Sequence, residues 1–330
     1  MRHASLSCPH VSLAKGQETR SHMDPALPEQ GPFTTRVLCR RTLCREHFSL
    51  ILELPSFPLA RPGQFLQILC GSAAIAASQS VVSPGRTAPG EWAPLLRRPF
   101  SIGGLQRSNS SVHIELLGRV VGPATAWLDE RRQGDAVEII GPLGRGFSPP
   151  DAAQSALLVA GGIGLPPIRW WGEILRNSGV SCTSIYGAQS RDLLPVSLKS
   201  EPASSGEPRL CVEELERVSI PTVVTTDDGS CGMRGRVTDA LKRILDGGSD
   251  PAFLRVYGCG PEPMLRTMAA ICTARGVACE LALERVMGCG MGTCQSCVVP
   301  LIDRARPSGW RYALCCTEGP VFNAVEIRWA

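Results

Sequence analysis

The sequence predicts a β-barrel followed by a doubly wound α/β domain, with a small cysteine-rich module at the C-terminus. Three observations support this. Short strand-like runs separated by turn residues fill 31–150, and apolar runs alternate with helical stretches in 151–275. Five of the fifteen cysteines lie between Cys289 and Cys316. The 330 residues exceed one compact core, so two domains and a module fit the length.

The composition excludes several classes of protein. Hydrophobic residues make up 43% and charged residues 19%, which is typical of a globular chain. A net charge of +4, from 34 basic and 30 acidic residues, is too balanced to favour nucleic acid or an anionic membrane. No apolar run is long enough to span a bilayer, and 1–30 lacks the apolar stretch of a secretory signal. We expect a flexible N-terminal tail over 1–30 and a cytoplasmic protein.

The first half of the chain has the pattern of an antiparallel barrel. Its runs of β-branched and apolar residues alternate in part with polar ones, and turn residues separate them. A single helix is expected over 124–132. Residues 71–93, rich in Ala, Ser, Gly and Pro, are expected to form an exposed loop insertion. The expected strands are 34–39, 48–54, 65–69, a strand at Phe100, 112–117 and 136–140.

The pattern changes near residue 151. The run at 156–160 is apolar throughout, as expected of a strand buried on both faces. Alternation of strand and helix then implies a parallel, doubly wound sheet. The expected strands are 156–160, 182–186, 221–225 and 254–257, and the expected helices are 166–177, 237–245 and 264–275.

The C-terminal cysteines have a diagnostic spacing. Cys289, Cys294 and Cys297 form C-x4-C-x2-C, and Cys316 follows nineteen positions later. This spacing is typical of a plant-type [2Fe–2S] cluster. Structural zinc usually takes two C-x2-C pairs, and here Cys294 and Cys297 make the one such pair in the cluster. Zinc and buried free thiols remain alternatives. Because Cys315 adjoins Cys316, the residues alone leave the fourth ligand open.

Glycines inside the cysteine loop suit a metal cluster. Gly290 and Gly292 allow positive φ, so the loop can wrap tightly and direct its N–H groups at sulfur. Such N–H groups stabilise the charge added on reduction and so set the redox potential.

The sequence Arg98-Pro99-Phe100-Ser101 suits a flavin. An arginine offers a bidentate fork to a pyrophosphate, and a small hydroxyl such as that of Ser101 suits the flavin N5. By itself the motif also fits a surface arginine beside an ordinary strand.

The segment Gly122-Pro123-Ala124-Thr125 opens the predicted helix, and a helix N-terminus attracts anions such as the same pyrophosphate. The glycine turn over 141–147 is at least as consistent with a purely structural role as with a ligand contact.

Two glycine turns predict a nicotinamide nucleotide site. Gly161, Gly162 and Gly164 follow a buried strand and open a helix, which is where open α/β sheets bind ligands. Cys259-Gly260 forms a second strand-to-helix turn, and we expect both turns to border one crevice. Cys259 either faces the nicotinamide ring or is a buried small residue.

The kind of nucleotide is less constrained. The turn 227–230 either contacts ribose or adenine or is an ordinary turn. No basic cluster awaits a 2′-phosphate, which favours NAD over NADP. No histidine follows His113, so no catalytic base is expected.

Together these motifs resemble the ferredoxin reductase superfamily. The cysteine loop narrows the resemblance, which covers roughly 31–325, to the electron transfer subunits of dihydroorotate dehydrogenase. In that family's closing segment the cysteine lies three residues before the glycine, which selects Cys316 over Cys315. The matching stretches are 62–65, 98–101, 141–144, 161–164, 226–230, 259–261, 289–297 and 316–322.

The resemblance implies a β-barrel flavin domain (31–150), an α/β nicotinamide domain (151–275) and a [2Fe–2S] module (276–330). Two departures from the family are Ala124, where glycine is usual, and Gly118, where an aromatic residue is common. A third is the insertion at 71–93. The residues implied to hold FAD are Arg98, Pro99, Phe100, Ser101, Leu117, Gly118, Arg119, Ala124 and Thr125.

The resemblance also implies a partner and a role. The partner is an FMN-containing catalytic subunit, in a heterotetramer of two subunits of each kind. Dihydroorotate is oxidised on that FMN, and electrons pass through [2Fe–2S] to FAD and then to NAD⁺, in pyrimidine (UMP) biosynthesis. A reductase subunit of a hydrogenase or oxygenase, and a zinc-stabilised interaction module, are the alternatives.

Overall fold

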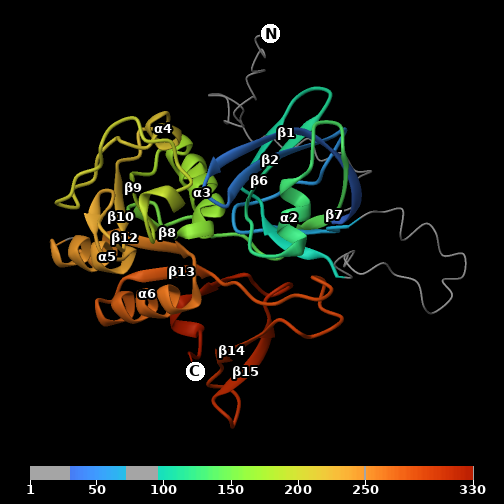
Figure 1. Ribbon diagram of the computed structural model, residues 1–330. Coiled ribbons are helices and arrows are strands. Elements are labelled where there is room, and N and C mark those ends of the chain that lie inside the picture. Colours follow the sequence, from blue (N-terminus) through green and yellow to red (C-terminus); the bar gives the residue numbers. More distant parts are fainter. Residues whose placement is uncertain (1–29, 72–95, 249, 330) are drawn as a thin grey trace, which may run out of the picture.

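The computed structural model describes residues 30–71, 96–248 and 250–329 (Figure 1). Nearly all of the predicted tail (1–30) and of the predicted loop insertion (71–93) lies outside these residues. Two sheets lie side by side, and the cysteine-rich segment lies against both (Figure 1). The predicted fold class is confirmed. None of the described helices is both long enough and apolar enough to cross a membrane.

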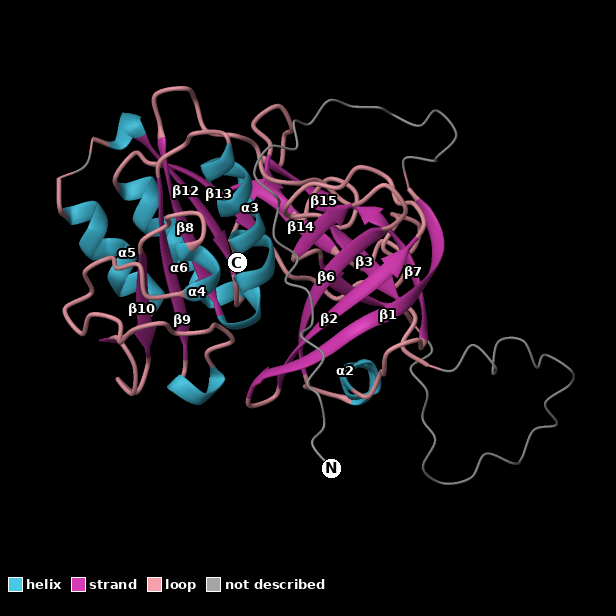
Figure 2. Cartoon of the chain, turned by 90° about the horizontal axis from the view of Figure 1, so that it is seen from above, coloured by secondary structure: helices cyan, strands magenta, loops and turns pink. Residues whose placement is uncertain are grey.

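The first sheet is antiparallel and curves into a half-barrel, with strand order β4-β3-β7-β1-β2-β6-β5 (Figure 2). Leu50, Leu52, Leu66 and Ile68 face its interior and are fully buried. Helix α2 (Pro123–Asp129) is shorter than predicted. The strands are β1 (Gly31–Cys44), β2 (His47–Leu54), β3 (Phe65–Ile68), β4 (Arg98–Ser101), β5 (Gly104–Arg107), β6 (Val112–Arg119) and β7 (Ala136–Leu143).

Strand β1 is longer than the predicted strand 34–39 because it pairs with two neighbouring strands. Its first part pairs with β7 and its second part with β2, and two register shifts separate the paired stretches along β2. Strand β5 was not predicted, since its four residues include two polar ones and show no apolar alternation.

The second sheet has the order β11-β10-β9-β8-β12-β13-β16, and it is parallel except for β16. Helices α3 (Leu165–Asn177) and α4 (Glu213–Glu216) pack on one face, and α5 (Val237–Asp246) and α6 (Glu262–Ala274) on the other. The strands are β8 (Ser155–Gly161), β9 (Cys182–Ala188), β10 (Thr222–Thr226), β11 (Met233–Arg234), β12 (Leu254–Cys259), β13 (Ala278–Ala282) and β16 (Val321–Asn323).

The cysteine-rich segment leaves this sheet after β13 and returns to it as β16. Between them lie the cysteine loop and a hairpin of β14 (Val298–Ile302) and β15 (Trp310–Leu314). Two strands of the range 276–330 therefore belong to the second sheet, although the domain limits themselves stay predictions. The module shares its hydrophobic core with the α/β domain.

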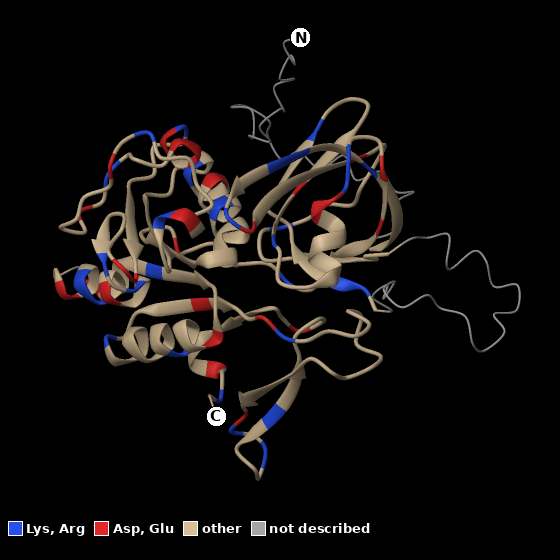
Figure 3. Cartoon of the chain, viewed as in Figure 1, with Lys and Arg blue, Asp and Glu red and all other residues tan. Residues whose placement is uncertain are grey.

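Basic and acidic residues are interspersed along the described part of the chain (Figure 3). This distribution agrees with the nearly balanced charge of the sequence.

Candidate functional site

The cysteine loop is folded by backbone conformations that favour glycine. Gly290 has φ +77° and Gly292 has φ +93°, as the sequence predicts, and Gln295 also has a positive φ of 54°. These three positions turn the chain tightly between β13 and β14. As a result the backbone N–H groups of the loop face its cysteine sulfurs.

Cys289 and Cys294 form one pair. The N–H groups of Met291 and Cys294 donate to Cys289 Sγ, each at 3.4 Å. The N–H group of Cys289 donates to Cys294 Sγ, also at 3.4 Å. Donors of this kind favour a thiolate, which is the form that binds metal.

Cys297 and Cys316 form the second pair. Cys316 follows β15, and its N–H group donates to Cys297 Sγ at 3.4 Å. Both residues are buried, whereas Cys294 is exposed. The structure thus places the four cysteines that the sequence singled out in two pairs.

The two pairs differ in electrostatics. The Ser296 hydroxyl lies 3.2 Å from Cys294 Sγ. Its hydrogen bond, with the N–H groups of Ser296 and Cys289, lowers the pKa of Cys294 to about 6. Burial raises the pKa of Cys316 to about 12, with a contribution from Cys297.

Two cysteine pairs, each linked by N–H to sulfur hydrogen bonds, suit a two-iron cluster. Within the described residues, no three His, Cys, Asp or Glu side chains are grouped to hold one metal ion. A [2Fe–2S] cluster takes two protein ligands on each iron, whereas structural zinc takes four around one point. A cavity of about 180 Å³ borders Cys316, Gly290 and Met291 on one side and Leu143 and Gly144 of the barrel on the other.

Cys315 points away from this cavity. Its thiol donates to the carbonyl oxygen of Leu283 at 3.7 Å and lies in the core shared by the module and the second sheet. Burial raises the pKa of Cys315 to about 12. These contacts are those of a packed thiol.

The predicted flavin strand is β4, at the edge of the barrel. Phe100 packs into the barrel core, so Pro99 and Ser101 face the opposite side of the strand. The Arg98 guanidinium donates to the carbonyl oxygens of Leu96 at 2.8 Å and Arg97 at 3.3 Å. Arg98 is therefore engaged with its own segment.

The adjacent β6 explains one departure from the family pattern. A Cβ at Gly118 would lie 2.3 Å from Cζ of Phe48, which is the register partner of Gly118 on β2. The ring of Phe48 thus fills the space beside Gly118. Leu117 is buried against the α/β domain. Arg119 donates to Glu46 Oε2 at 3.0 and 2.8 Å.

Thr125 caps its own helix. Its hydroxyl oxygen accepts from the N–H groups of Val121 at 2.9 Å and Gly122 at 3.1 Å. Ala124 is buried. These bonds order the entry to α2 and leave the Thr125 hydroxyl fully engaged.

The two glycine turns that the sequence singled out contact each other. A Cβ at Gly164 would lie 2.1 Å from the Cys259 carbonyl oxygen, and one at Gly260 would lie 3.2 Å from the Gly161 nitrogen. Gly162, the first residue of the short helix η1 (Gly162–Gly164), has φ +54° and open space beside it. The two turns are therefore in contact at the carboxyl ends of β8 and β12, which is where open α/β sheets bind ligands.

Cys259 is a neutral thiol in the second of these turns. Burial raises its pKa to about 12, and the carboxylate of Glu284 adds to the shift. Its side chain is only partly buried. The residue therefore offers a small uncharged surface rather than a nucleophile.

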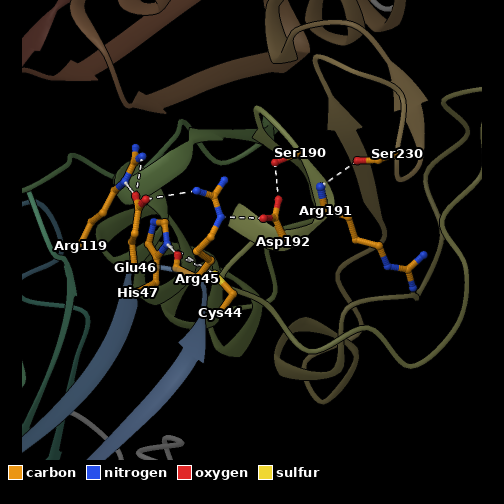
Figure 4. A network of polar contacts seen from close by, with 9 residues as sticks. All are labelled: Cys44, Arg45, Glu46, His47, Arg119, Ser190, Arg191, Asp192 and Ser230. Atoms are coloured by element: carbon orange, nitrogen blue, oxygen red, sulfur yellow. Dashed lines mark hydrogen bonds and ion pairs between the residues drawn. The ribbon is translucent and has the colours of Figure 1, made fainter.

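Sequence reasoning missed the polar contacts between the two domains. Arg45, in the turn between β1 and β2, donates its N–H group to the Asp192 carbonyl oxygen at 3.0 Å and its Nε to Asp192 Oδ2 at 2.6 Å (Figure 4). Glu46 joins Arg45 to Arg119 in the same network (Figure 4). Within the α/β domain, the Arg191 N–H group donates to Ser230 Oγ at 2.8 Å.

A buried ion pair makes a second connection. Arg169 of α3 donates to Glu115 of β6 at 2.5 Å and to the Gly103 carbonyl oxygen at 3.2 Å. Each side chain of the pair is 11% exposed. No local pattern marks these partners, because 54 positions separate them.

Comparisons with known proteins agree with this geometry. Residues 284–328 match the model of the iron–sulfur cluster binding domain of dihydroorotate dehydrogenase B. The chain resembles the electron transfer subunit of dihydroorotate dehydrogenase B (NAD⁺) from Desulforamulus reducens, at 31% identity over 90% of this chain and 98% of that protein. The subunit from Bacillus caldolyticus is 40% identical over 71% of this chain and 80% of its own length.

Solved structures share the fold. A chain of the NADH-dependent reduced ferredoxin–NADP oxidoreductase superposes with a TM-score of 0.68 at 23% identity, covering 89% of this chain and 90% of that one. The ferredoxin reductase of carbazole 1,9a-dioxygenase gives 0.57 at 20% identity, covering 77% and 68%. Identity above 30% along nearly the whole of one relative settles the family: this chain belongs to the dihydroorotate dehydrogenase B electron transfer subunits.

Proposed function

We propose that this chain passes electrons from a dihydroorotate dehydrogenase catalytic subunit to NAD⁺, in the synthesis of pyrimidine nucleotides. The proposal rests above all on the two cysteine pairs, Cys289 with Cys294 and Cys297 with Cys316, which lie beside the flavin-type barrel. The names of the relatives and the match to the cluster-binding model point the same way.

We assign one iron to Cys289 and Cys294 and the other to Cys297 and Cys316. The loop N–H groups that donate to these sulfurs hold them as thiolates and favour added negative charge. Cys315 is left out, because its thiol contacts the Leu283 carbonyl.

We assign FAD to the outer face of β4, next to β6 and α2. Pro99 and Ser101 face that side, and Arg98 would turn from its carbonyl partners to a phosphate. When bound, the flavin and the cluster supply single-electron transfer, and the flavin also supplies hydride transfer. The remaining predicted contacts are Leu117, Gly118, Arg119, Ala124 and Thr125.

We assign NAD to the two glycine turns. Gly161, Gly162 and Gly164 allow the backbone to approach a pyrophosphate, and Gly162 has open space beside it. Cys259 and Gly260 belong to the second turn, which contacts the first. The neutral Cys259 thiol suits an uncharged contact with a nicotinamide ring.

We propose a cytoplasmic heterotetramer of two catalytic and two electron transfer subunits. Apolar side chains beside the cluster loop suit contact with a partner: Val286 is 86% exposed and Met291 is 50% exposed. The division into a flavin domain (31–150), a nicotinamide domain (151–275) and a cluster module (276–330) belongs to the same proposal.

Anaerobic purification followed by iron, sulfide and flavin analysis tests the cofactors. We expect two irons, two sulfides and one FAD per chain. A colourless protein that contains zinc would support an interaction module instead. Mixing the loaded chain with an FMN-containing catalytic subunit should then give dihydroorotate-dependent reduction of NAD⁺. Failure there, together with activity in a hydrogenase or oxygenase complex, would contradict the proposed partner.

A further inference from the structure

Gln67 lies at the contact between the barrel and the cysteine loop. It belongs to β3, whose Leu66 and Ile68 pack into the barrel core. Because side chains alternate along a strand, Gln67 faces out of that core, toward the module. It is nevertheless completely buried.

The cysteine loop covers this side chain. A Cβ at Gly290 would lie 2.4 Å from Gln67 Cγ and 2.7 Å from Gln67 Nε2. Glycine is thus required here both for its φ of +77° and for the close approach of the amide. Gly290 follows Cys289 directly, so the Gln67 amide lies against the backbone of the loop that carries the proposed ligands.

Neither polar atom of the Gln67 amide has a hydrogen-bond partner in the described part of the chain. Buried amides are nearly always hydrogen bonded, and an isolated one is costly. Bulk water cannot supply these hydrogen bonds, because Gln67 is fully buried. A group bound beside the loop would supply the missing partner.

We infer that the Gln67 amide is a positioning residue for the iron–sulfur cluster, with Nε2 donating a hydrogen bond to a sulfur of the cluster or of its ligands. This inference rests on the proposed function. A donor at sulfur stabilises the more negative, reduced state and so raises the redox potential. Gln67 also connects the cluster to the flavin strand, because it is the register partner of Pro99 on β4.

Replacement of Gln67 by leucine tests the effect on the potential. Leucine keeps much of the volume and removes the donor. In the purified, cluster-loaded chain, an EPR-monitored redox titration of Gln67→Leu should show a threefold to tenfold lower ratio of reduced to oxidised cluster at a fixed potential. The tenfold limit corresponds to about 59 mV. The FAD potential should stay unchanged.

Gln106→Leu is the matched control. Gln106 lies on β5, which pairs with β6 and not with β3, and its register partner is His113. The same substitution there should leave both potentials as in the wild type. A full cluster with unchanged potential in Gln67→Leu would overturn the inference, and so would a shift confined to FAD. Absence of iron and sulfide from the wild type would overturn the proposed function as well.

A second measurement needs no stable Gln67 variant. Pulsed EPR on the reduced wild type, labelled with ¹⁵N at glutamine side-chain amides, should show a coupling from one such nitrogen. Gln295, inside the cysteine loop, is the competing source, so the coupling should survive in Gln295→Asn. Loss of the coupling in Gln295→Asn, or its absence from the wild type, would overturn the inference.

Discussion

The cysteine loop and the flavin strand solve the problem of binding a cofactor in opposite ways. In the loop, N–H groups already face the sulfurs of Cys289, Cys294 and Cys297. Among the predicted flavin contacts, Arg98 and Thr125 form hydrogen bonds with backbone groups of their own segments. The loop is built by neighbours in sequence, whereas the proposed flavin and nucleotide sites would combine residues from distant elements. Substitutions can distinguish effects on the cysteine loop from effects on the contacts between distant elements.

The largest expected effect is loss of the cluster in Cys294→Ser. Serine offers a poorer ligand, so iron and sulfide should disappear while FAD remains, as chemical analysis would show. Cys315→Ala is the control and should keep the cluster, because its thiol contacts the Leu283 carbonyl. Full iron and sulfide in Cys294→Ser would show that the ligand assignment is wrong.

Arg169→Met should weaken the contact between the domains and leave the iron and sulfide content unchanged. It leaves the carboxylate of Glu115 buried without its partner, and breaking such a pair costs about 3–5 kcal/mol. Urea denaturation measures the loss. In the double variant Arg169→Met, Glu115→Gln much of the stability should return. If the double variant were no more stable than the single one, buried charge would not be the cause.

Gly290→Ala should destabilise the module by about 2–4 kcal/mol, since a positive φ and a close contact act together. The new methyl group would lie 2.4 Å from Gln67. Gly309→Ala separates the two causes: its φ is +72°, but nothing lies within 4 Å of the added Cβ. Thermal unfolding should therefore show a clearly smaller loss of stability for Gly309→Ala than for Gly290→Ala. Equal losses of stability would show that the contact with Gln67 is not a cause.

Glu173 gives a pH dependence that arises at the domain contact. Burial raises the pKa of Glu173 to about 7, although Arg169 opposes the shift. Stability contributed by the protonated carboxyl is present at low pH and lost as pH rises through 7. Glu173→Gln should therefore gain about 1–3 kcal/mol relative to wild type between pH 5 and pH 8, measured by denaturation. A gain independent of pH would contradict this.

The smallest effect is expected at Arg45, which pairs with Asp192 on the exposed side of the domain contact (Figure 4). Exposed pairs contribute little and are screened by salt. Arg45→Ala should thus shift the unfolding midpoint only slightly at low salt and not at all at high salt. A large shift of the unfolding midpoint that persists in high salt would contradict this, and would show that the Arg45 network contributes to stability as a buried ion pair does.

The same contrast explains what the sequence could predict. The cysteine spacing and the glycines of the loop are local, so the pairing region could be found without a structure. Apolar runs such as 156–160 likewise predicted the buried strands. The partners Arg45 and Asp192, 147 positions apart, carry no local signal, and neither does the buried amide of Gln67. Strands β13 and β16 were missed because their short runs adjoin cysteine-rich turns.

The return of the chain as β16 has a consequence for assembly. Leu281 of β13 and Phe322 of β16 are register partners. The segment between them, which contains the cysteine loop and the β14–β15 hairpin, is therefore closed when β16 pairs with β13. Four cysteines tied to one inorganic core would shorten the loop that this segment forms and lower the entropy lost when the last strand docks. The supply of iron and sulfide would thereby set how firmly the end of the polypeptide is held, and how readily proteases reach it.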